Sequence, residues 1–219
     1  TFQATENDIF LSGCGRNPKG LNCPKETVFR DVDFGASVII AQRSDGKDIL
    51  LGGQKGGTVW ALDPDNGGKL VWRQDFGEGS PLGGIHWGIA SDGERVFAPI
   101  NRPYGFTPPK DGGTPQKPGM HGLKIDTGEV LWTYVAQPDC SGDRATRVKS
   151  CGTNIGLSAA PAVIDGAVVE GGLDGMLRAF DAQSGEVLFQ FDTARTFEAL
   201  NGVEGKGGSI DNASVSWIR

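Results

Sequence analysis

The chain has few of the residues that build metal sites, membrane spans or nucleic-acid surfaces. Its 219 residues include only two histidines, His86 and His121, and four cysteines without a Cys-x-x-Cys pair, so no zinc site is expected. The longest apolar runs, such as residues 37–41, have strand length, and no membrane span is predicted. Lys and Arg number 21 against 27 Asp and Glu, and this net charge of −6 argues against a nucleic-acid partner.

The chain also lacks an initiating Met and the basic and apolar regions of a signal peptide, because it opens on TFQATENDIF. It ends on SWIR without a turn or a cap. We therefore interpret it as a mature product or a fragment of a longer protein, and the missing signal says nothing about export.

Glycine, in contrast, is abundant. There are 35 glycines in 219 residues, about twice the usual share of ~7%. They follow no collagen period, so they are expected in turns, bulges and close backbone contacts. Helical periodicity is scarce, with residues 193–203 as the one short candidate. This composition predicts an all-β protein with many turns.

The cysteines form two local pairs, each enclosing a polar loop. We expect disulfides Cys14–Cys23 and Cys140–Cys151 rather than free thiols, and they indicate an oxidising compartment such as the periplasm. No Cys-x-x-Cys-His is present, so this stretch carries no covalent c-type haem.

Three segments repeat one pattern: residues 58–76, 122–136 and 177–193. Each reads as a β-hairpin with a Gly in the turn and an aromatic residue in the second strand, and the three aromatic residues are Trp72, Trp132 and Phe189. Asp63 and Asp181 are expected to accept hydrogen bonds within their turns, whereas Lys124 replaces this residue in the second copy. Further strands precede each hairpin.

Repeated four-stranded units of this kind favour a β-propeller over a generic β-sandwich. A closed ring has four to eight blades, so residues 1–219 are expected to form about half a ring, of three to four blades. The excess length between the repeats lies in loops.

The repeated hairpin resembles the tryptophan-docking motif of the pyrroloquinoline quinone (PQQ) dehydrogenase superfamily, whose members are eight-bladed propellers. The resemblance covers nearly the whole chain and is nearest to periplasmic quinoprotein alcohol dehydrogenases, particularly the polyvinyl-alcohol dehydrogenase branch. It implies that Trp72, Trp132 and Phe189 have structural roles between blades. It also implies that this chain is the C-terminal half of such a ring.

The segment RDVDFGASVII (30–40) resembles the family stretch that carries the catalytic aspartate. Asp33 is the better match and Asp31 is the alternative. The D-x-D spacing places both carboxylates on one face of an extended strand, where they raise one pKa or recruit a cation. The competing interpretation is a surface strand with two solvated acids. Lys55, in GGQKGGTVWALD (52–63), matches the basic residue that contacts the quinone oxygens, where a cation stabilises developing negative charge. The alternative is an exposed turn lysine.

The segment GGIHWG (83–88) resembles a later family stretch that approaches the cofactor. It implies that Trp87, His86 and Gly84 border PQQ, with Trp87 as a wall rather than the floor. The alternative is a Trp buried in the core of a blade. Asn101 is a further candidate metal ligand beside Asp31 and Asp33.

Together, the resemblance implies an enzyme that oxidises an alcohol, polyvinyl alcohol or another secondary alcohol, by hydride transfer to PQQ. Ca²⁺, or a lanthanide in its place, would assist, and electrons would pass to a cytochrome c. The alternative function is a non-catalytic propeller that binds proteins, of the outer-membrane assembly lipoprotein type.

Overall fold

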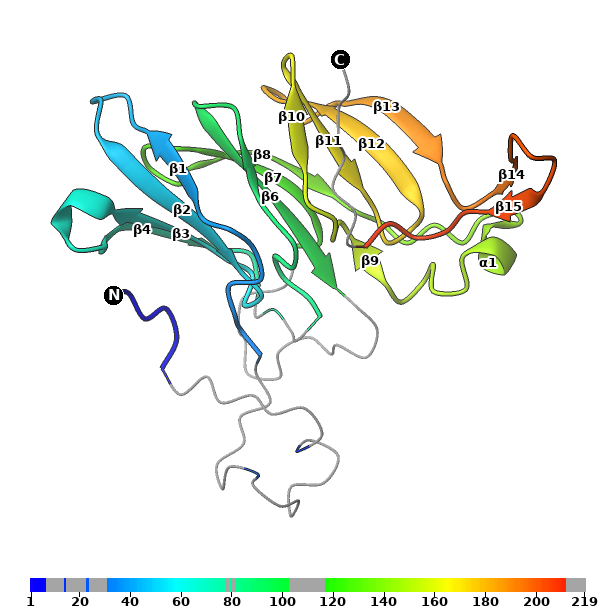
Figure 1. The fold of residues 1–219 in the computed structure, drawn as a ribbon, viewed down its shortest axis with the longest axis horizontal. Coiled ribbons are helices and arrows are strands. Elements are labelled where there is room, and N and C mark those ends of the chain that lie inside the picture. Colours follow the sequence, from blue (N-terminus) through cyan, green and yellow to red (C-terminus); the bar gives the residue numbers. More distant parts are fainter. Residues whose placement is uncertain are drawn as a thin grey trace.

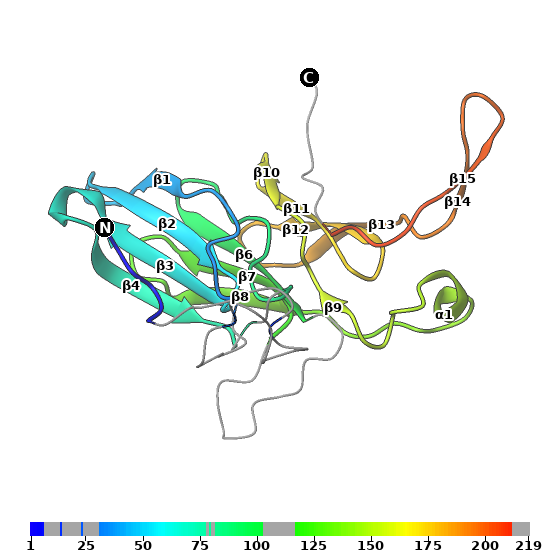
Figure 2. The same cartoon turned by 60° about the horizontal axis from the view of Figure 1, so that its bottom comes forward.

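The structure is a computed structural model that describes residues 1–6, 14, 23, 31–77, 79, 82–102 and 117–211. Three antiparallel sheets follow one another along the chain and lie side by side (Figure 1). Figure 2 shows the same succession with the molecule turned so that its bottom comes forward. The predicted all-β class is confirmed.

The first sheet has the order β1-β2-β3-β4 and contains the first repeated hairpin. Its strands are β1 (Ile39–Gln42), β2 (Asp48–Gln54), β3 (Thr58–Asp63) and β4 (Lys69–Asp75), with the 3₁₀ turn η1 (Pro64–Asn66) between the last two.

The second and third sheets repeat this order. The second contains β5 (Ala90–Ser91), β6 (Arg95–Arg102), β7 (Gly119–Lys124) and β8 (Val130–Val135), and β9 (Ile155–Gly156) pairs with β6. The third contains β10 (Ala162–Ile164), β11 (Ala167–Gly171), β12 (Met176–Asp181) and β13 (Val187–Asp192).

Each hairpin turn has the expected glycine in the left-handed region, with φ of 64° at Gly67, 72° at Gly128 and 74° at Gly185. The Asp63 and Asp181 carboxylates accept backbone hydrogen bonds within their turns, as predicted. The Lys124 turn lacks that carboxylate, and its Asp126 instead accepts from the backbone N–H of Ser44 in the first sheet.

Two inserts depart from the repeated sheets. The helix α1 (Arg144–Arg147) lies in the loop that the Cys140–Cys151 disulfide closes, and β14 (Thr196–Glu198) pairs with β15 (Glu204–Lys206). The predicted helix over 193–203 is therefore wrong. Thr196 and Phe197 favour extended structure, and Gly202, with φ of 76°, supplies a turn. Both predicted disulfides are present.

Tryptophans of one sheet pack on the hairpin turn of the next. The Trp72 indole N–H donates to the Ile125 carbonyl at 2.7 Å, and a Cβ at Gly128 would collide with its ring. Trp132 repeats this arrangement, donating to Ala182 at 3.0 Å beside Gly185. The glycines are thus required both for the turn and for the close contact.

Phe189 differs from the expectation that it packs between sheets. Phe189 is 53% exposed, and among the described residues no turn glycine lies against its ring as Gly128 and Gly185 lie against the two tryptophans.

The tryptophan contacts make a direct prediction for stability. Trp132→Phe keeps an aromatic ring but removes the indole N–H that donates the hydrogen bond. We expect it to lower the free energy of unfolding by about 1 kcal/mol. Phe189→Leu changes the exposed aromatic residue at the equivalent position of the third hairpin. Its free energy of unfolding should stay within about 0.5 kcal/mol of that of the parent chain. Urea unfolding of both variants checks this. Equal losses of unfolding free energy would show that the contact of Trp132 with the next hairpin turn contributes nothing specific.

The buried His121 predicts that the free energy of unfolding depends on pH. Its imidazole is buried against Phe76, with ring centroids 4.0 Å apart, and burial lowers the pKa to about 4. The unfolded chain therefore takes up this proton near pH 6.5, before the folded chain does. Stability from this group is complete above pH 6.5 and is lost as the pH falls toward 4, by about 2 kcal/mol at pH 5.

The measurement is urea unfolding at pH 7.5 and pH 5 for the parent chain and His121→Gln. The variant should lose about 2 kcal/mol less over this interval. An identical loss of unfolding free energy in both proteins would show that His121 does not cause this pH dependence.

Candidate functional site

The predicted residues Asp31, Asp33 and Lys55 form an ion-pair cluster at one end of the first sheet. Lys55 Nζ lies 3.1 Å from Asp31 Oδ2 and 3.5 Å from Asp33 Oδ2. Lys55 stands in the turn between β2 and β3, and its backbone N–H donates to the Asp33 carbonyl at 3.0 Å. The coil before β1 and this turn are therefore fixed together. The competing interpretation, two solvated surface acids, does not describe the buried Asp31 but agrees with the exposure of Asp33.

The two aspartates differ in their surroundings. The Asp31 side chain is 11% exposed and that of Asp33 is 65% exposed. The Asp31 carboxyl, which shares a hydrogen bond with Asp33, raises the pKa of Asp33 above its usual value, and partial burial adds to this effect. Lys55 acts in the opposite direction. Asp33 is thus the carboxyl that can reach a ligand, while Asp31 is the buried partner of the lysine.

The segment 83–88 packs closely on the Lys55 turn. Gly84 has φ of 64°, and a Cβ there would collide with the Lys55 carbonyl oxygen. Gly79 faces the same carbonyl from the same side and is equally crowded. The glycines of this segment are therefore explained by backbone contact, and they place His86 and Trp87 beside the cluster.

Trp87 is 39% exposed, so it is not a buried core residue. Its ring lies 4.5 Å from that of His86. His86 is 9% exposed, and burial lowers its pKa, so the imidazole is neutral at pH 7. The charges of Asp211, Lys55 and Asp31 also act on His86, which places it in the same neighbourhood.

Asn101 is positioned differently from the two aspartates. It is 1% exposed, and its Nδ2 donates to Ser158 Oγ at 2.6 Å. Its backbone N–H and carbonyl pair with Gly84 at 3.1 and 3.2 Å. Asn101 thus supports the segment that carries His86, and its role as a metal ligand stays a prediction. The other histidine, His121, belongs to the core.

The fit of these residues to a cation can be judged from their donor atoms. Asp31 Oδ1 is buried and accepts no hydrogen bond from the described residues, and carboxylate oxygens are what Ca²⁺ prefers. Within the described ranges, however, no three or more His, Cys, Asp or Glu side chains cluster around one point. The site described supplies part of a ligand set.

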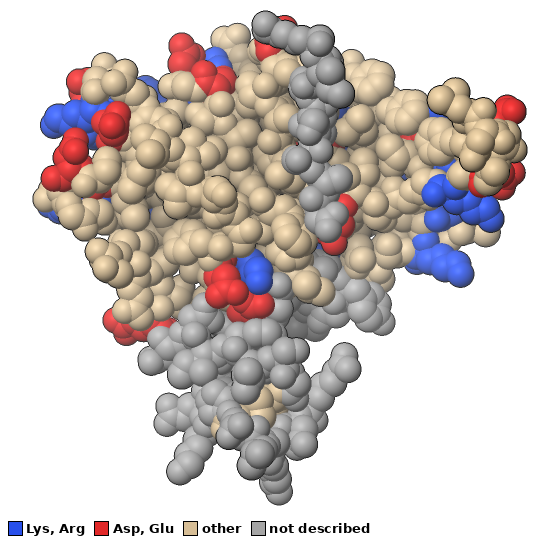
Figure 3. Space-filling model, viewed as in Figure 1, with Lys and Arg blue, Asp and Glu red and all other residues tan. Residues whose placement is uncertain are grey.

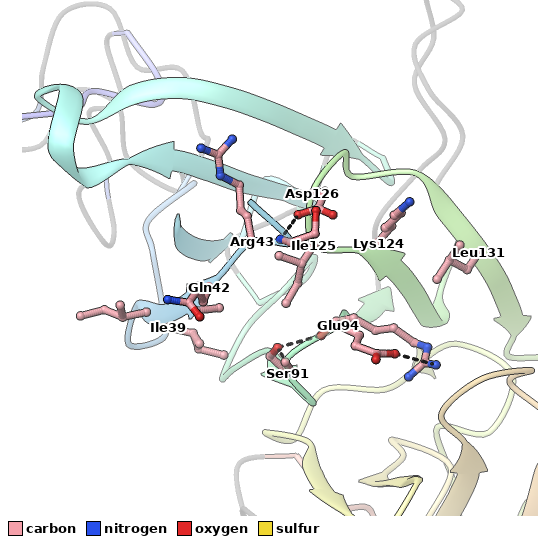
Figure 4. A pocket seen from close by; sticks show the side chains of 14 residues that line it. Ile39, Gln42, Arg43, Ser91, Glu94, Lys124, Ile125, Asp126 and Leu131 are labelled. Carbon is pink, nitrogen blue, oxygen red and sulfur yellow. Dashed lines mark hydrogen bonds and ion pairs between the residues drawn. The ribbon is translucent and has the colours of Figure 1, made fainter. Parts of the chain in front are cut away.

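A separate hollow of about 940 Å³ lies at the other end of the sheets (Figure 4). It is lined by β1 and by the turns that follow β1, β5 and β7, including Arg43, Glu94 and Asp126. None of the predicted site residues lines it, so this hollow and the ion-pair cluster are distinct. Figure 3 shows acidic and basic groups meeting in the lower centre, where the coil before β1 runs in Figure 1.

Comparison with known proteins identifies the family. A family model described as outer membrane protein assembly factor BamB matches residues 55–209. Polyvinylalcohol dehydrogenases of Sphingopyxis sp. (strain 113P3) and Pseudomonas sp. are 36% and 35% identical over 97% and 96% of this chain. The chain belongs to the quinoprotein propeller superfamily. It spans about a third of the length of these two relatives, 31% of each.

A solved structure agrees with this fold. A europium-containing methanol dehydrogenase superposes with a TM-score of 0.52 at 15% identity, covering 80% of this chain and 39% of that chain. The predicted β-propeller class is confirmed, and the three sheets are successive blades of a quinoprotein propeller. No helix among the described residues is long and apolar enough to cross a membrane.

Sequence reasoning missed two residues of this end of the blades, Ser158 and Asp211. Ser158 is fully buried, and its hydroxyl donates to Asp211 Oδ1 at 2.5 Å. Both follow an apolar residue, as His86 follows Ile85, but no local sequence pattern relates the three positions.

The glycine contact yields a test of how the site is held. Gly84→Ala introduces a left-handed alanine and a collision with the Lys55 carbonyl, whereas Gly67→Ala has the same φ of 64° with no atom within 4 Å. We expect Gly67→Ala to cost about 1 kcal/mol and Gly84→Ala about 1–3 kcal/mol more. Urea unfolding gives both values. Equal costs would show that the close backbone contact is not required.

Proposed function

We propose that this chain is part of a periplasmic quinoprotein that oxidises an alcohol, with PQQ as the electron acceptor. The observation that carries the proposal is the Asp33–Lys55–Asp31 cluster beside the exposed Trp87, in a chain about one-third identical to two polyvinylalcohol dehydrogenases. The substrate class proposed is a secondary alcohol, with polyvinyl alcohol as one member.

The residues fit the cofactor in charge and shape. When bound, PQQ supplies a quinone carbonyl that accepts a hydride, and its Ca²⁺ or lanthanide ion polarises that carbonyl. The Lys55 ammonium complements an anionic quinone, and the exposed Trp87 ring offers it a flat wall. Gly84 and His86 are proposed neighbours of the cofactor. Asp31 and Asp33 would contribute carboxylate oxygens to the ion, with Asn101 as a further candidate ligand, and other parts of the complete protein would supply the rest.

Asp33 is proposed as the general base. Its carboxylate is exposed and would accept the proton of the substrate hydroxyl. Asp31, buried against Lys55, holds the ammonium in place and sets the pKa of Asp33. This division of roles favours Asp33 over Asp31 as the base.

Several partners follow from the proposal. Two electrons leave the reduced cofactor, and a cytochrome c is the proposed acceptor. The remaining blades of the propeller would complete the pocket. The two disulfides support a periplasmic location, because such bonds persist in oxidising compartments.

A second candidate function is a non-catalytic propeller that binds proteins. It is favoured by the description of the matching family model, outer membrane protein assembly factor BamB. A scaffold of that type needs no base and no quinone contact, and the Lys55–Asp31 pair would then serve only to join the coil before β1 to the turn after β2.

The test is alcohol-dependent dye reduction by the complete protein, reconstituted with PQQ and Ca²⁺. Asp33→Asn should lower kcat by about 10²–10⁴-fold, because an amide cannot accept the proton. The exposed Asp65→Asn, in the turn between β3 and β4, is the control and should be unchanged. Full activity in Asp33→Asn, or no alcohol-dependent reduction by the parent protein, would contradict the proposal.

A further inference from the structure

The same backbone contact recurs at three junctions, or seams, along the chain: between the first and second sheets, between the second and third sheets, and between the third sheet and the segment that ends at Asp211. The backbone N–H groups of Ile85, Leu157 and Ile210 donate to Gln54, Ile100 and Gly172, at 3.3, 3.1 and 3.0 Å. Each acceptor lies near the end of the second strand of the preceding blade. The residue that follows each donor is therefore presented in the same way on every seam, and these residues are His86, Ser158 and Asp211.

Ser158 joins this row to Asn101. Its hydroxyl accepts from Asn101 Nδ2 at 2.6 Å and donates to Asp211 Oδ1 at 2.5 Å. An amide NH₂ can only donate and a carboxylate can only accept, so both of these directions are fixed. The hydroxyl of the fully buried Ser158 thereby holds the amide of Asn101 and the carboxylate of Asp211 in place.

Two acceptor groups flank this serine, one buried and one exposed. Asn101 Oδ1 is buried, and no described residue donates to it, although an unpaired buried acceptor is costly. Asp211 is exposed, and Ser158 occupies its Oδ1. Such a site selects a hydrogen-bond donor or a cation.

A hydroxyl donor is favoured over a cation by the number of charges. Asp211 is the one carboxylate in this network, whereas Ca²⁺ takes six to eight oxygen ligands, commonly with several carboxylates. The charges of Asp211 and of Lys55 both act on His86, so the network and the ion-pair cluster both lie in the neighbourhood of this residue. A substrate reaching Asp33 can therefore extend toward Asp211.

We propose that Asp211, oriented by Ser158 and Asn101, is a second hydroxyl-binding subsite that selects polyhydroxylated alcohols. It accepts a hydrogen bond from a substrate hydroxyl other than the one that Asp33 deprotonates. The inference rests on the proposed function and adds a specificity-determining residue to it. The substrate class is an alcohol chain with repeated hydroxyl groups.

The experiment compares pentane-2,4-diol with pentan-2-ol on the complete protein with PQQ and Ca²⁺. Asp211→Ala should lower kcat/KM for the diol by about 10- to 100-fold through KM, since a charge-assisted hydrogen bond is lost, and leave pentan-2-ol unchanged. Ser158→Ala should act in the same direction. Asp48→Ala, an exposed aspartate at the start of β2, removes the same charge and should change neither substrate.

Binding of the diol to the protein without cofactor, followed by saturation-transfer NMR, gives a second readout. The signal should weaken in Asp211→Ala and persist in Asp48→Ala. Equal effects on both alcohols, or an unchanged diol signal, would overturn the subsite. Loss of bound calcium in Asp211→Ala would assign the network to a cation and overturn it as well. If the parent protein oxidises neither alcohol, the proposed function fails, and the NMR signal alone then decides on the subsite.

Discussion

The candidate site depends on one interaction, the ion pair between the Lys55 ammonium and the Asp31 carboxylate. Both side chains are largely buried, so each needs the other to offset the loss of hydration. The pair joins the coil before β1 to the turn after β2, and the Asp33–Lys55 backbone hydrogen bond repeats that link. Asp33 is left at the outer edge of the pair, where Asp31 raises its pKa.

Close backbone contact makes this arrangement possible. Gly84 meets the Lys55 carbonyl at a distance that excludes a side chain, and the neighbouring blade thereby supports the turn. The hairpins show the same dependence on glycine, because Trp72 and Trp132 lie on Gly128 and Gly185, where a Cβ would collide with the indole rings. Glycine therefore permits close packing both between the sheets and at the candidate site, and this gives the high glycine content a physical cause.

Much of the fold was predictable because it is repeated. The hairpin pattern located β3–β4, β7–β8 and β12–β13, and the turn glycines adopt the expected φ values. The short insert at 193–203 was not predicted correctly, since its composition suits a helix as well as a hairpin. The exposure of Phe189 was also missed, because a sequence motif does not say whether a partner blade is present in the chain.

The site was predictable only in part. Spacing and resemblance brought Asp31, Asp33 and Lys55 together in advance, and the structure adds which aspartate is buried. Ser158 and Asp211 were missed because a single polar residue carries no local pattern. Only the backbone hydrogen bonds between neighbouring segments relate these two residues to His86. The predicted contacts of Trp87, His86 and Gly84 with PQQ stay predictions.

The most direct test of the central claim is an absorbance titration of the complete protein with PQQ in the presence of Ca²⁺, alongside Lys55→Met. The account predicts saturable binding of one quinone per protein, and a strong loss of affinity when the ammonium is replaced by an apolar side chain of similar length. No binding by the parent protein, or equal binding by Lys55→Met, would contradict it.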